Sequence, residues 1–191
     1  MVSLSIHETC SVFRILVKSI SEPGRLCTFD SCGIDSDLPL IYQLCNTLLD
    51  NEVSFSVIGK IVEESFINSI TVLCGALYTD VDNAQYVVVY GGNSYGYLQN
   101  VSRGCLEYPD TGATVIYCVD DLGQEKKIKL RLTGPGIERE RIIGLGGVPL
   151  SEIEMINAMN SDFPLGIDVI FCDKSSVLSI PRSTKLEILK D

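Results

Sequence analysis

The chain has 191 residues, and its 15 lysines and arginines against 25 aspartates and glutamates give a formal net charge of −10 at pH 7. Hydrophobic residues make up 46% of it and charged residues 21%, which is ordinary for a globular protein and excludes disorder over the whole length. The acidic balance disfavours nucleic-acid binding, and no apolar run approaches the ~20 residues of a membrane-spanning helix. We therefore expect one soluble domain over residues 1–191.

Eight cysteines are scattered along the chain, and no two of them have the C-x-x-C spacing. A zinc ribbon, a redox dithiol or an iron–sulfur site therefore has little support, and we expect no bound metal. The first eight residues have neither the basic segment nor the continuous apolar segment of a secretory signal. Most of the cysteines are expected to be small core residues of a cytoplasmic protein.

Two helices are predicted at the start of the chain. The first covers residues 7–20, because apolar side chains recur there at helical spacing, and its buried face is expected to comprise Phe13, Leu16, Val17 and Ile20. The second should follow Ser36 as its N-cap and carry apolar pairs every four residues. Asn51 is expected to end it in the left-handed conformation.

The next segments predict a strand, a short helix and a buried strand. Residues 52–58 alternate between apolar and polar side chains, which is typical of a half-buried strand. A short helix is expected over residues 59–68. Residues 86–90 form a continuous apolar run that two glycines end, so we expect a strand buried on both faces.

Two hairpins and one helix are predicted in the second half. Residues 113–119 and 126–132 flank a turn-forming segment, as do residues 167–172 and 177–180. Between the hairpins, Ser151 and Glu154 have the spacing of a capping box, which predicts a helix to about Met159. The fold class is therefore α/β, with a mixed sheet that contains antiparallel hairpins and has helices packed on it.

One strand is unusually basic for an acidic chain. Lys127, Lys129 and Arg131 alternate with apolar residues, so the three cations share one face. They could form an anion site or contact an acidic partner. Equally, they could be a solvated strand face whose lysines discourage edge-to-edge pairing.

A second candidate pair is Asp168 and Arg182, at the two ends of the second predicted hairpin. A hairpin brings its ends together, so the two side chains are expected to meet as an ion pair. The guanidinium could hold a phosphate-bearing group, or the pair could only brace the hairpin. His7 is the one histidine, so a catalytic triad has no support.

Five short motifs occur in order along most of the chain. They are Phe13-Arg14 through Ser21-Glu22-Pro23-Gly24, Pro109-Asp110-Thr111-Gly112-Ala113-Thr114, Leu130-Arg131-Leu132-Thr133-Gly134-Pro135-Gly136-Ile137, Phe163-Pro164-Leu165-Gly166-Ile167-Asp168 and Ile180-Pro181-Arg182-Ser183-Thr184. Together they resemble the PhnH family, whose members are subunits of the bacterial carbon–phosphorus lyase system for phosphonate use. Each motif is weak alone, but five in register from residue 13 to residue 184 are specific.

The resemblance implies a fold similar to the large domain of pyridoxal-phosphate-dependent transferases, without that cofactor or any other. It implies a homodimer when the protein is isolated, and a core complex with G-, I- and J-type subunits in the cell. That complex couples a phosphonate to ATP with release of adenine, giving a ribose 1-phosphonate 5-triphosphate. Radical cleavage of the carbon–phosphorus bond then belongs to the J-type subunit. A nucleotide or a phosphonate is the ligand class that the resemblance suggests.

The resemblance supplies candidates and shows two departures. Polar residues within the matched motifs, as candidates for binding an anion or a partner, are Arg14, Arg131, Thr133, Asp168 and Arg182. Asp110 stands where the family has glutamate, and Ser161 stands near the place of an expected histidine. No catalytic residue is carried over.

Two other functions are alternatives. A stand-alone pyridoxal-phosphate transferase would need a lysine for a Schiff base, and Lys18, Lys60, Lys174 and Lys185 are available outside any supporting motif. A small module that binds a phosphonate or a nucleotide would use Arg131 and Arg182.

Overall fold

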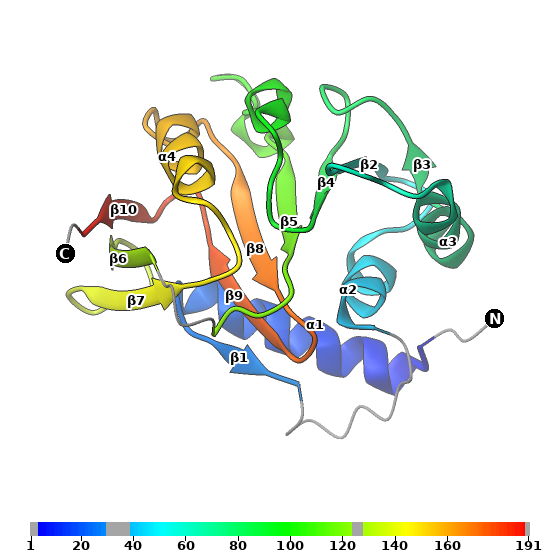
Figure 1. The fold of residues 1–191 in the computed structure, drawn as a ribbon, viewed down its shortest axis with the longest axis horizontal. Coiled ribbons are helices and arrows are strands. Elements are labelled where there is room, and N and C mark those ends of the chain that lie inside the picture. The colour runs from blue at the N-terminus through cyan, green and yellow to red at the C-terminus, as the bar shows by residue number, and fades with distance from the viewer. Residues whose placement is uncertain (1–3, 30–38, 124–127, 190–191) are drawn as a thin grey trace.

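Five short strands run parallel through the centre of the molecule (Figure 1). Strands β9 and β1 extend them on one side, and each pairs antiparallel with the strand before it in the sheet. The computed structural model describes residues 4–29, 39–123 and 128–189. The strand order is β1-β9-β8-β5-β4-β2-β3. These strands are β1 (Cys27–Thr28), β2 (Ser54–Ile58), β3 (Leu77–Tyr78), β4 (Tyr86–Tyr90), β5 (Thr114–Cys118), β8 (Asp168–Cys172) and β9 (Ser176–Ile180). The expected α/β class with a mixed sheet is confirmed.

Both faces of this sheet are covered. One face carries the helices α1 (Ile6–Ser21), α2 (Leu40–Leu48) and α3 (Glu64–Cys74), while the other carries helix α4 (Leu150–Met159) and a three-stranded antiparallel sheet. The small sheet has the order β10-β6-β7 and consists of β6 (Ile128–Thr133), β7 (Arg141–Leu145) and β10 (Lys185–Ile188). Two single-turn 3₁₀ helices, η1 (Tyr97–Asn100) and η2 (Pro109–Thr111), lie between β4 and β5. Coverage on both faces explains why the central strands are continuous runs of Val and Ile rather than alternating sequences.

Helix α1 confirms the first predicted helix but buries a different face. Ser5 and Glu8 form a capping box at its start. Of the four residues expected to be buried only Leu16 is, whereas Phe13, Val17 and Ile20 are exposed. The buried stripe comprises Val12, Ile15, Leu16 and Ser19. Both stripes have helical spacing, so the choice between them depends on the contacts with α2 and β9.

Several predicted boundaries need correction. Ser36 lies outside the described residues, and α2 ends at Leu48 with an extended Leu49 rather than with a left-handed Asn51. The helix expected over residues 59–68 lies further along the chain as α3, whose C-cap Gly75 has a φ of 75°. Helix α4 ends at Met159 as predicted, but Pro149 is its N-cap and no side-chain capping bond forms.

The first predicted hairpin is wrong, and the second is confirmed. Strand β5 lies between β4 and β8 and is parallel to both, while β6 belongs to the small sheet and pairs with β7 and β10. Val115, Ile116 and Tyr117 of β5 are fully buried, which needs cover on both faces of the strand and a place in the middle of the sheet. Strands β8 and β9 pair antiparallel, with Val169 opposite Ile180.

The cysteines occupy mixed environments. Cys27, Cys45 and Cys172 are buried, Cys74 and Cys118 are half-buried, and Cys10 and Cys105 are exposed. Burial raises the pKa of the Cys45 thiol and raises that of Cys74 to about 11. Within the described ranges, no helix combines the length and apolar composition needed to cross a bilayer.

Candidate functional site

One arginine links the amino end of strand β8 with the segment that precedes β5. Arg182 follows β9, and its Nε and Nη2 donate to Asp168 Oδ2 at 3.0 and 2.6 Å, while its backbone N–H donates to Asp168 Oδ1 at 2.9 Å. Its Nη1 donates to the carbonyl of Pro109 at 2.6 Å, and Nη2 donates to that of Gly112 at 3.1 Å. The ion pair expected between Asp168 and Arg182 is therefore present, and it extends to the segment that precedes β5.

This arrangement braces the sheet. The Arg182 side chain is 13% exposed and most of its N–H groups already have an acceptor, so an additional anion would find few free donors. Asp168 is 38% exposed and accepts three of these bonds. The structure shows contacts between Arg182, Asp168 and the segment before β5, and binding of an anion by the pair remains a prediction.

In the described part of the basic strand, the charge of Arg131 is paired with acidic neighbours. Lys127 lies outside the described residues. Arg131 forms ion pairs with Glu187 at 2.9 Å and with Glu140 at 3.2 Å, and Glu187 comes from the neighbouring strand β10. Lys129 is exposed on the same strand, and Thr133 is half-buried opposite Lys185. Acidic neighbours therefore offset the charge of Arg131, one of the three aligned cations that we expected to be a local exception in an acidic chain.

Arg14 lies apart from the other candidates, on the exposed side of α1. It lines a shallow groove of about 240 Å³ together with Thr9, Cys10, Phe13 and Thr47. Of the predicted residues that the structure describes, Asp168 and Arg182 are joined by hydrogen bonds, while Lys129, Arg131 and Thr133 share strand β6 and Arg14 lies in a third region.

A candidate site for a small molecule lies at the carboxyl ends of β2 and β4. These two parallel strands are neighbours, but the chain leaves them toward opposite faces of the sheet. After β2 it passes Gly59 and enters α3 on the face of α1 and α2. After β4 it turns at Gly92, where φ is 74° and a Cβ would overlap the Gly147 carbonyl, and reaches η1 on the other face. Such a divergence opens a crevice between the strands, and α/β proteins bind ligands there.

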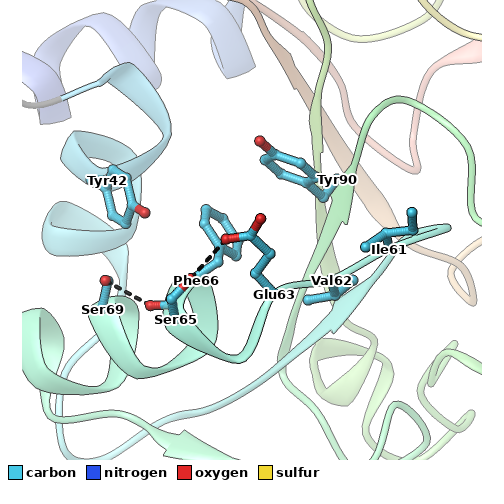
Figure 2. Close-up of a pocket in the computed structure, with 8 residues that line it drawn as sticks. All are labelled: Tyr42, Ile61, Val62, Glu63, Ser65, Phe66, Ser69 and Tyr90. Carbon is cyan, nitrogen blue, oxygen red and sulfur yellow. Dashed lines mark hydrogen bonds between the residues drawn. The ribbon is translucent and has the colours of Figure 1, made fainter.

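A cavity of about 410 Å³ occupies this crevice (Figure 2). Its lining comes from α2, from the connection after β2, from the first turns of α3 and from the end of β4. The lining residues are Tyr42, Ile61, Val62, Glu63, Ser65, Phe66, Ser69 and Tyr90. The volume falls within the range of small-molecule sites.

Three aromatic rings form one wall of this cavity. The ring centroid of Phe66 lies 5.5 Å from that of Tyr42 and 5.0 Å from that of Tyr90, with tilted planes. Burial raises the pKa of Tyr42, although a hydrogen bond with Ser69 acts in the opposite direction, so its hydroxyl is neutral at pH 7. Figure 2 shows the Tyr42 and Tyr90 hydroxyls and the Glu63 carboxylate facing a common central space.

Sequence reasoning missed this site. The sequence does contain one indication of it, because Gly59 after β2 and the glycine pair after β4 mark turns of the chain at the ends of these strands. Recognising a crevice there also requires the knowledge that β2 and β4 are neighbours, and residues 59–85 separate them in the sequence. Pairing over such a distance leaves no local pattern.

A second cavity, of about 460 Å³, lies at the amino ends of the same strands. Its lining includes Gln85, Asp110, Thr111 and Gly112. It adjoins the Arg182 brace, because the Gly112 carbonyl accepts from that guanidinium. The lysines considered for a Schiff base are absent from the linings of this cavity and of the carboxyl-end cavity, as far as the described residues go.

A buried carboxylate lies near the carboxyl ends of β4 and β5, on the face of the sheet that carries α4. Glu152 of α4 accepts from the Tyr117 hydroxyl at 2.5 Å and from the backbone N–H and the hydroxyl of Ser94, both at 2.9 Å. All three residues are buried, and burial followed by the Glu152 charge raises the pKa of Tyr117 far above its usual value. The cluster ties the chain after β4 to α4 and β5. In the described part of the chain, no three His, Cys, Asp or Glu side chains are placed to hold a metal ion.

Comparison with known proteins identifies the family. The model of the bacterial phosphonate metabolism protein (PhnH) family matches residues 2–187. The chain belongs to the PhnH family. A relative in Stutzerimonas stutzeri, described as a putative C-P lyase subunit protein HtxG, is 29% identical over 179 residues, which cover 93% of this chain and 85% of the relative.

Another PhnH-family relative comes from Rhizobium meliloti (strain 1021). It is described as an alpha-D-ribose 1-methylphosphonate 5-triphosphate synthase subunit PhnH, and it is 27% identical over 186 residues. The alignment covers 95% of this chain and 92% of that relative.

The five PhnH motifs meet in two places in the fold. Pro109, Gly112, Asp168 and Arg182, from three of the motifs, make up the amino-end brace. The other two motifs also touch, because a Cβ at Gly24 would clash with the Leu132 side chain. The motifs that carry the resemblance therefore hold segments of the fold together.

Proposed function

We propose that the chain is a subunit of a carbon–phosphorus lyase core complex and takes part in coupling a phosphonate to ATP with release of adenine. The family match over residues 2–187 carries this proposal, and the name of the Rhizobium relative supports the ribose triphosphate step. In this proposal the chain has a scaffolding or co-catalytic part and acts with G-, I- and J-type subunits.

An exposed apolar seam on α1 supports a place in a larger assembly. The α1 seam consists of Ile6, Cys10, Phe13, Val17 and Ile20. Their spacing of four, three, four and three residues matches the seam of a helix that packs against another helix. Exposed apolar surface of this kind marks protein contact sites, and we assign the seam to a partner subunit.

Arg14 gives the same surface a polar neighbour. It lines the groove of about 240 Å³ beside Cys10 and Phe13. An acidic side chain of the partner could pair there while the seam buries its apolar residues. This places one of the residues predicted to bind an anion or a partner at the proposed interface.

The test is co-expression of the tagged chain with G-, I- and J-type subunits, followed by size exclusion and an assay of adenine release from ATP and methylphosphonate. We expect the chain to co-elute with the other subunits, and we expect adenine release to fall strongly when it is omitted. A chain that never co-elutes, or that can be left out without loss of adenine release, contradicts the proposal.

The seam is tested with Val17→Asp and a matched control, Ile142→Asp. Val17 is 48% exposed on α1 and Ile142 is 57% exposed on β7, so both changes place a carboxylate on an exposed apolar position. We expect Val17→Asp to abolish co-elution and Ile142→Asp to leave it intact. Equal behaviour of the two variants would remove the seam from the interface.

A further inference from the structure

The side chains that line the carboxyl-end cavity favour a different class of ligand from the nucleotide or phosphonate that the family resemblance suggests. Glu63 is the only residue of the described lining that carries a formal charge at neutral pH. Its Oε2 accepts a hydrogen bond from Ser65 Oγ at 3.0 Å, which orients the carboxylate and leaves further acceptor positions unused. The electrostatic potential inside this cavity therefore favours a positively charged ligand.

The aromatic wall has the same preference. The faces of aromatic rings carry partial negative charge and attract cations, and clusters of aromatic side chains bind alkylammonium groups in this way. Tyr42, Phe66 and Tyr90 supply three rings around one space, and the two tyrosine hydroxyls can accept hydrogen bonds. Ile61 and Val62 add an apolar side against which a hydrocarbon chain can lie.

An anion fits the cavity less well. The first turn of α3 does present backbone N–H groups that could attract one. Glu63, however, is the residue at the N-cap, and its carboxylate lies in the same cavity. A phosphonate would have to approach this negative charge with no lysine or arginine among the described lining residues to offset it.

We propose that the carboxyl-end cavity binds a small organic cation, an alkylammonium compound whose charged group lies between the aromatic rings and the Glu63 carboxylate. The cavity volume of about 410 Å³ suits a small metabolite. The site belongs to the isolated chain, because all its lining residues lie on α2, α3, β4 and the connection after β2. It is therefore independent of the proposed role in a lyase complex.

The test uses the full chain and a pair of ligands that differ in charge alone. Choline is the cationic probe, and 3,3-dimethylbutan-1-ol is its neutral analogue of the same shape. Saturation-transfer NMR and calorimetry should show choline binding clearly more tightly than the alcohol. Methylphosphonate is the anionic probe, and it should show no binding at this cavity.

Variants assign the binding to the cavity. Glu63→Gln should weaken choline about tenfold, and Tyr90→Leu should weaken it about threefold, while Tyr90→Phe should keep most of the affinity. The matched control is Glu64→Gln, which removes the same charge from the next residue, exposed on the same helix but outside the lining. It should leave the affinity unchanged.

Three outcomes would overturn the proposal. They are equal binding of choline and its neutral analogue, equal effects of Glu63→Gln and Glu64→Gln, and binding of methylphosphonate in place of choline. Circular dichroism and the urea midpoint of each variant establish that it is folded. Failure here would not affect the proposed function, which is judged by co-elution and adenine release.

Discussion

The two ends of the parallel strands are built on opposite plans. At the amino end, Arg182 joins Asp168 with the carbonyls of Pro109 and Gly112, so three segments distant in sequence are tied by one side chain. At the carboxyl end, the chain leaves β2 and β4 toward opposite faces and a cavity opens between them. The brace can hold β5 and β8 in register, while the open end keeps surface for a ligand. Stability and binding are therefore expected to respond to different substitutions.

The largest expected loss of stability follows Arg182→Ala. The substitution leaves Asp168 without its ion pair and removes the guanidinium donor from the Gly112 carbonyl, while the Pro109 carbonyl keeps the backbone N–H of Gly112. The free energy of unfolding should therefore fall by about 3 kcal/mol. Urea denaturation followed by circular dichroism measures this. Arg182→Lys keeps the charge but not the planar guanidinium, so we expect its free energy of unfolding to lie between those of Arg182→Ala and wild type. A fall below about 1 kcal/mol for the alanine variant would show that the brace matters little.

The buried carboxylate at the carboxyl end provides the next test. Tyr117→Phe removes the hydroxyl that donates to Glu152 and should lower the free energy of unfolding by about 2 kcal/mol at neutral pH. The matched control is Tyr95→Phe, because Tyr95 is exposed and should tolerate the change. Equal stability of the two variants would contradict a strong Tyr117–Glu152 contact.

The same residue predicts a dependence on pH. Burial and the Glu152 charge raise the pKa of Tyr117, so the folded protein keeps the phenol neutral while an unfolded tyrosine ionises near pH 10. This contribution to stability is complete below about pH 10 and falls as the pH rises above that value. The stability difference between wild type and Tyr117→Phe should therefore be smaller at about pH 11 than at about pH 8. A constant difference would contradict the shift.

A smaller effect is expected on the small sheet. Arg131→Ala removes ion pairs with Glu140 and Glu187, but all three side chains are more than a third exposed. Solvent screens such pairs, so the free energy of unfolding should change by less than about 1 kcal/mol, and the change should decrease with added salt. A loss as large as that of Arg182→Ala would show that the basic strand is a second brace.

The smallest effect on stability is expected at the open end. Glu63→Gln removes an exposed carboxylate that accepts a hydrogen bond from the exposed Ser65, so the free energy of unfolding should stay within about 0.5 kcal/mol of wild type. The same variant should lose affinity for choline. A large loss of stability here would mean that the cavity wall is part of the structural framework.

The amino-end pair was predictable from the sequence, and the carboxyl-end cavity was not. Asp168 and Arg182 flank a hairpin, and a hairpin places its ends together whatever the rest of the fold does. Tyr42, Phe66 and Tyr90 come from three elements whose proximity depends on the sheet order. The exposed face of α1 shows a similar limit, because two apolar stripes share one helix and only the neighbouring elements select which is buried.

The sequence by itself determined the α/β class, the first and last helices, the second hairpin and the family motifs. Each of these depends on local periodicity, on turn residues or on matches that a linear chain displays. The tertiary structure decided that β5 is a central parallel strand rather than half of a hairpin, which stripe of α1 is buried, and where β2 and β4 diverge. The physical reason is that a strand with an apolar run can pair with any strand that offers backbone donors and acceptors. Which strands pair is decided by how the whole core is buried, and the sequence of a single segment does not contain that information.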